Sequence, residues 1–146
     1  MAIIIGSLAA HIHCPLQWGR FNDIDLVMWE DELDEWIKEG QWTIFGSSAF
    51  GISYVGRPMG PSGKIVEVTT VARNADNSTA RMLRFMEGAE GLRTTRILGR
   101  DVPVLPLAWL YALKRSHLYV KDSPHFVKTM RDVHILREMM PEEVVP

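Results

Sequence analysis

The sequence contains little cysteine, no large excess of either charge and no long apolar run. Among its 146 residues Cys14 is the only cysteine, which excludes an internal disulfide and fits a reducing compartment. The 16 Lys and Arg residues nearly balance the 18 Asp and Glu residues, so no global positive field would hold nucleic acid nonspecifically. The apolar start, "MAIIIGSLAAHIHC", is too short for a membrane span and lacks the basic segment of a signal peptide. We therefore expect a cytoplasmic protein with no membrane partner.

The amino-acid composition is that of a globular protein, with 47% hydrophobic and 23% charged residues. We expect residues 1–146 to form a single domain, because no repeat, low-complexity tract or linker interrupts the chain. β-branched or alternating runs predict the following strands: 2–5, 23–28, 64–72, and two short ones within 41–56 that lead into a loop at 57–63. Amphipathic segments and caps predict the following helices: 8–13, 30–40, about 78–88, 107–118 and 123–137, with a hairpin turning at 99–101. The prediction is an α/β (α+β) fold with a short mixed sheet and two C-terminal helices.

The stretch "NDIDLV" places two acids, Asp23 and Asp25, on alternate positions of an apolar strand. Residues at i and i+2 of a strand point to the same side, so the two carboxylates lie near each other. Like charges in a partly dry site raise a pKa unless a cation sits between them, and Mg²⁺ prefers oxygen ligands. Glu67, within the predicted strand 64–72, is the natural third acid. The alternative is that the acids simply lie at a solvent-exposed strand end.

Gly6 and Ser7 end the first predicted strand just before a predicted helix. Glycine lets the backbone approach a ligand closely, and free N–H groups at a helix start, together with a serine hydroxyl, bind phosphate oxygens. The alternative for such a pair is an ordinary turn.

The order strand, Gly-Ser, helix, loop, strand, Asp-x-Asp resembles the nucleotidyltransferase superfamily with the polymerase-β-like core. The superfamily's signature is Gly-Ser followed by "D[IV]DL", which here reads Gly6-Ser7 and residues 23–26. The chain is similar to small nucleotidyltransferase-like proteins of phage and bacterial genomes. If the protein is encoded by a phage, the expected location is the cytoplasm of the host cell. The resemblance implies that Gly6 and Ser7 hold the phosphates of a nucleoside triphosphate. It also implies that Asp23, Asp25 and Glu67 bind Mg²⁺ or Mn²⁺.

The last third of the chain resembles the ending of small members of this superfamily, a hairpin followed by two helices that carry lysine. The resemblance implies that Lys114, His117 and Lys128 point toward the triphosphate or the acceptor. The alternative is a helix-surface pair between Lys128 and Asp132 on a solvated basic face. Arg20 either contacts a phosphate or neutralises the acids, and ordinary loop solvation explains it equally well.

The resemblance implies metal-dependent transfer of a nucleoside monophosphate from a nucleoside triphosphate, with release of pyrophosphate. The acceptor (RNA, protein or small molecule) and the oligomeric state stay open. Two rival hypotheses are a degenerate module that binds nucleotide or a partner without chemistry, and a metal-dependent nuclease. Thr69 argues against the nuclease, because such cores usually carry lysine two residues after the glutamate. A zinc site at His11, His13 and Cys14 is disfavoured by its spacing.

Overall fold

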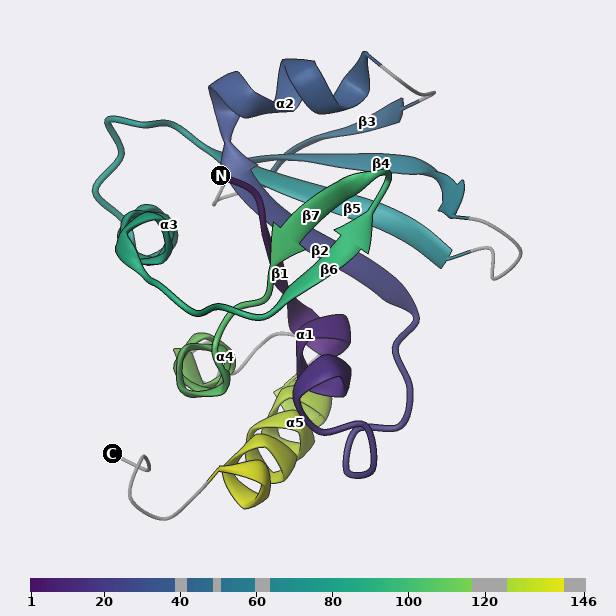
Figure 1. Ribbon diagram of the computed structural model, residues 1–146, viewed down its shortest axis with the longest axis vertical. Helices are drawn as coiled ribbons and strands as arrows, with labels where there is room; N and C mark the ends of the chain where they lie inside the picture. Colours follow the sequence, from purple (N-terminus) through teal and green to yellow (C-terminus); the bar gives the residue numbers. More distant parts are fainter. Residues whose placement is uncertain (39–41, 49–50, 60–63, 117–125, 141–146) are drawn as a thin grey trace.

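The computed structural model describes residues 1–38, 42–48, 51–59, 64–116 and 126–140, and within 42–48 and 51–59 it describes the backbone alone (Figure 1). The helices are α1 (Gly6–His13), α2 (Glu30–Ile37), α3 (Ser78–Gly88), α4 (Leu107–Ser116) and α5 (Phe126–Met139). The strands are β1 (Ile3–Ile5), β2 (Asp23–Trp29), β3 (Trp42–Ser48), β4 (Gly51–Met59), β5 (Lys64–Val71), β6 (Thr94–Ile97) and β7 (Arg100–Pro103). The predicted mixed α/β fold class is confirmed.

The main sheet has the strand order β1-β2-β5-β4-β3, and β6 and β7 form a separate hairpin. Strands β2 and β5 are parallel, whereas the other neighbours in the main sheet are antiparallel, so the sheet is mixed as predicted. The register aligns Asp25 with Glu67 on β5 and with Ile5 on β1. The end of β1 and both acids therefore meet at one place in the sheet.

The core forms around β2. Near the start of this strand only one face is buried, whereas towards its end both faces are buried. Ile24, Leu26 and Met28 are buried as alternation requires, and from Val27 onward the opposite face is buried as well. Figure 1 shows α1, α4 and α5 gathered where β1 ends and β2 begins, while α2 lies at the other end of β2. Helix α4 contacts both α1 and α5. Only near its start, at the acids, does β2 keep a face open to solvent.

The loop predicted at 57–63 is wrong over its first three residues, because β4 continues to Met59. Pro58 pairs with Ile65 after a register shift that follows Val55, and the pairing of β3 with β4 reaches only to Gly56. Proline has no backbone N–H to donate, so a strand tolerates it where a bulge or an unpaired edge makes that hydrogen bond unnecessary. Residues 60–63 lie outside the described residues.

The sequence offers Asn77 or Ser78 as the cap of α3, and the structure uses Asn77, which provides a test of local stability. The Asn77 side chain accepts a hydrogen bond of 2.8 Å from the Ala80 N–H. We expect Asn77→Ala to lower the free energy of unfolding by about 1 kcal/mol, because the N–H loses its acceptor. Urea unfolding measures this change, and Asn77→Asp, which keeps the acceptor, is the control. Equal loss in both variants would contradict the capping role.

The ends of the last two predicted helices are only partly described. Helix α4 is seen to Ser116, and α5 begins at Phe126, so the predicted cap at Ser123 lies outside the described residues. Within the part of the chain that the structure describes, no helix has both the length and the apolar character needed to cross a membrane.

Candidate active site

Asp25 is half-buried on β2 and lies against Glu67 of the parallel strand β5. Burial raises the pKa of Asp25 to about 7, and the charge of Glu67, a hydrogen bond with Glu67 and the charge of Asp23 add to the rise, while Lys114 lowers it. The two paired carboxyl groups are therefore suited to share a proton or a cation. Asp23 and Glu67 are exposed, so solvent reaches the pair.

Gly6 is positioned so that only glycine leaves room for the Asp25 carboxylate. Its φ is +68°, which side-chain-bearing residues rarely adopt, and a Cβ at this position would lie 2.4 Å from Asp25 Oδ2. Helix α1 starts at Gly6, and its N-cap residue Ile5 provides no side-chain hydrogen bond to the first turn. Ser7, which is half-buried, lies in that same turn. The end of β1 thus brings backbone N–H groups, a hydroxyl and a carboxylate together.

Lys114 of α4 pairs with a second acid, Asp132 of α5, and its charge also acts on Asp25. Its Nζ is 3.5 Å from Asp132 Oδ2, and the charge of Lys114 is close enough to Asp25 to counteract the rise that burial causes in the pKa of that carboxyl. Asp132 is buried, whereas Lys128 is exposed. Asp132 therefore pairs with Lys114 on a neighbouring helix, and the surface pair between Lys128 and Asp132 is not what the structure shows.

The remaining predicted site residues are placed less centrally. Arg20 is exposed in the loop that precedes β2, and Lys128 is exposed on α5. His117 lies outside the described residues. Their proposed contacts with nucleotide stay predictions.

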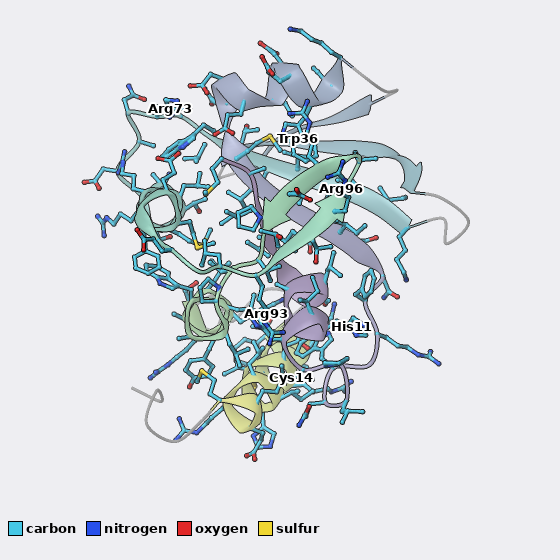
Figure 2. All side chains as sticks on the ribbon, in the orientation of Figure 1. His11, Cys14, Trp36, Arg73, Arg93 and Arg96 are labelled. Atoms are coloured by element: carbon cyan, nitrogen blue, oxygen red, sulfur yellow. The ribbon has the colours of Figure 1, made fainter. Side chains whose placement is uncertain are left out.

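The histidines of α1 serve the structure itself. His11 Nδ1 lies 2.7 Å from the carbonyl oxygen of Trp18, and His13 Nε2 lies 2.8 Å from that of Leu105. Each ring donates its proton to a backbone oxygen, which argues against a shared zinc ion. Cys14 is a free, half-buried thiol close to His11 on α1 (Figure 2). Trp18, whose carbonyl accepts from His11, packs against the core.

The donor chemistry of the carboxylate pair fits a hard divalent cation, although two ligands rather than three converge. Among the described residues, no three His, Cys, Asp or Glu side chains are grouped as a metal-binding set. Asp25 and Glu67 are adjacent and supply oxygen ligands, and the exposed Asp23 side chain lies two residues away on the same face. A third ligand thus requires the exposed Asp23 side chain to turn toward the pair.

The sequence interpretation missed how Asp132 and Gly6 act in this site. Asp132 lies on the buried stripe of α5 with Thr129, Leu136 and Met139. An acid at an apolar stripe position was the available signal, because an unpaired charge is rarely buried. No local signal shows that Gly6 faces Asp25, since that contact depends on the pairing of β1 with β2.

Comparisons with known proteins support the fold. A family model described as a domain of unknown function (DUF7275) matches residues 109–145, and no curated protein matches the chain. The crystal structure of an antigenic nucleotidyltransferase-like protein from Paracoccidioides brasiliensis is 18% identical, with a TM-score of 0.53 over 95% of this chain and 68% of that one. The solution structure of the antibiotic-resistance factor ANT(2'')-Ia is 12% identical, with a TM-score of 0.52 over 98% of this chain and 76% of that one.

A crystal structure of ANT(2")-Ia in complex with adenylyl-2"-tobramycin is 16% identical, with a TM-score of 0.51 over 98% of this chain and 82% of that one. All three structures share their overall fold with the chain. The protein therefore has a nucleotidyltransferase fold, and the resemblance drawn from Gly6-Ser7 and residues 23–26 is confirmed at the level of the fold.

Proposed function

We propose that the protein transfers a nucleoside monophosphate from a nucleoside triphosphate to a hydroxyl-bearing acceptor and releases pyrophosphate. The observation that carries the proposal is the pairing of Asp25 with Glu67 directly beside Gly6. Carboxylates, a glycine that permits close approach and a nearby lysine are the groups that this chemistry needs at one point. The shared fold supports the same conclusion.

Asp25 and Glu67, with Asp23 turned toward them, would hold Mg²⁺ or Mn²⁺. The cation would neutralise phosphate charge and polarise the phosphoryl group. Gly6 and Ser7 would bind the β- and γ-phosphates through backbone N–H groups and the hydroxyl. In the reaction the acceptor oxygen forms a bond to the α-phosphorus as the bond to the pyrophosphate oxygen breaks. The acceptor proton passes to a carboxylate of the pair, Asp25 or Glu67.

A small molecule is the acceptor class that the neighbours favour. The ANT(2")-Ia structure is described as a complex with adenylyl-2"-tobramycin, in which the acceptor is a small molecule. Because Asp23 and Glu67 are exposed, the pair is open to an acceptor that approaches from solvent. We therefore propose a small hydroxyl-bearing molecule ahead of RNA or protein.

The test is a calorimetric titration of the four ribonucleoside triphosphates with Mg²⁺ into the wild type and into Asp23→Asn/Asp25→Asn. We expect the wild type to bind at least one triphosphate only with the metal, and the double variant to lose about 100-fold or more in affinity because the ligands are gone. Asp34→Asn/Glu35→Gln, which removes two exposed acids from α2, controls for the change of two in net charge.

No binding to the wild type would overturn the proposal. Binding without turnover on any acceptor would instead favour a module that holds nucleotide without chemistry. Cleavage of DNA or RNA that depends on Asp25 would favour a nuclease.

A further inference from the structure

Asp132 is the buried charge that the proposed reaction does not use. It is 6% exposed, on the face of α5 that also buries Thr129 and Leu136. Its Oδ2 is buried and makes no hydrogen bond with any of the described residues, although Lys114 Nζ lies at an ion-pair distance of 3.5 Å. A buried carboxylate is costly unless a charge and hydrogen bonds compensate it. The ion pair with Lys114 is the compensation that the described residues provide.

Lys114 is the residue through which Asp132 can act on the site. A lysine near the surface normally extends its ammonium into water, yet this side chain is only 22% exposed. Its charge acts on Asp25 against the rise in pKa that burial causes there, so the ammonium feels two anionic centres. Asp132 of α5 pairs with the ammonium, and Asp25 of the sheet also attracts it.

We propose that Asp132 is a positioning residue that keeps the Lys114 ammonium at the rim of the carboxylate pair, where it meets the phosphates of an incoming nucleotide. This inference rests on the proposed function. Without the Asp132 charge, the flexible lysine would turn toward Asp25 and Glu67 and neutralise them itself. It would then compete with the divalent cation for the same two carboxylates. Asp132 therefore keeps the Lys114 ammonium away from the carboxylate oxygens that would bind the metal ion.

The experiment measures ATP affinity and the Mg²⁺ concentration for half-maximal ATP binding, by calorimetry. The proteins are the wild type, Asp132→Asn, Lys114→Met and the double variant. We expect Asp132→Asn to weaken ATP binding about 10-fold and to raise the required Mg²⁺ about 10-fold, as for loss of a group that orients a ligand. Lys114→Met should weaken ATP binding without raising the Mg²⁺ requirement, because no ammonium remains to compete. The double variant should match Lys114→Met.

Two further variants separate positioning from folding. Asp132→Glu keeps the charge and should restore most of the Mg²⁺ response. Glu138→Gln removes an exposed acid from the same helix and should leave both quantities unchanged. If Asp132→Asn does not fold, the comparison of Asp132→Glu, Lys114→Met and the double variant still decides, because removing both partners of a buried pair is better tolerated than removing one.

The outcomes distinguish this inference from the proposed function. A wild type that binds no nucleotide overturns both. If the wild type binds ATP with Mg²⁺ but the Mg²⁺ requirement of Asp132→Asn equals that of the wild type, this inference alone is overturned. In that case the pair of Lys114 and Asp132 only joins α4 to α5. Effects of the two single variants that multiply in the double variant would overturn the inference as well, because they would show that the two residues act independently.

Discussion

Gly6→Ala is expected to remove metal-dependent nucleotide binding while leaving the protein folded. The new methyl group would lie 2.4 Å from Asp25 Oδ2, a distance that forces the carboxylate away from its place beside Glu67. A side-chain end can move more cheaply than backbone, so most of the loss falls on the site and little on the fold. A displacement of about 1 Å in such a site reduces its efficiency about 100-fold, and we expect at least that loss in the affinity for ATP with Mg²⁺.

Gly91→Ala is the matched control for this prediction. Gly91 has a φ of +67°, nearly the +68° of Gly6, but a Cβ added there would meet nothing within 4 Å, whereas one added at Gly6 meets Asp25. Both variants therefore carry the same backbone penalty, about 1–2 kcal/mol in the free energy of unfolding. Only Gly6→Ala should also lose nucleotide affinity, measured by calorimetry near neutral pH. Equal affinities in the two variants would show that Gly6 serves the turn alone.

Local patterns were sufficient to predict most of the elements. The alternation in residues 23–28 and the β-branched run in 64–72 predicted β2 and β5, and a cap at Asn77 or Ser78 predicted the start of α3. The boundaries differ by one to three residues where packing extends or shortens an element. Pro58 was not predictable as a strand residue, because its tolerance in β4 depends on a bulge and on where β3 stops pairing.

The residues of the site were more predictable than the contacts between them. Asp23 and Asp25 are recognisable by their spacing along one strand, and Glu67 was predicted as the third acid from its place in the strand 64–72. The contact between Asp25 and Glu67 joins strands that are distant in sequence, and only the parallel register shows that the two residues lie opposite each other. The pairing of Lys114 with Asp132 depends on how α4 packs on α5, and helical spacing alone indicated Lys128 instead.

Asp25→Asn is expected to stabilise the metal-free protein, and to do so increasingly as the pH rises from about 4 to about 7. The pKa of Asp25 is raised from 3.8 to about 7 in the folded protein, chiefly by burial and then by Glu67. Below pH 3.8 the group is protonated in both states and costs nothing. Between that pH and about 7 the unfolded chain ionises first, so the wild type loses stability until both states are ionised. The loss relative to Asp25→Asn reaches on the order of 4 kcal/mol, since the pKa rises from 3.8 to about 7 and one pKa unit is worth about 1.4 kcal/mol.

Urea unfolding of both proteins at several pH values, with EDTA or with Mg²⁺, measures this difference. With Mg²⁺ we expect the wild type to recover much of its lost stability above the pKa of Asp25, because the cation binds the ionised pair in the folded protein only. Asp25→Asn should not respond, and Asp34→Asn, on the exposed face of α2, should respond like the wild type. A difference between wild type and Asp25→Asn that is the same at both ends of this pH range would show that Asp25 is not a strained carboxylate. A pH-dependent difference that Mg²⁺ leaves unchanged would mean that the strain is real but that the pair shares a proton rather than a metal ion.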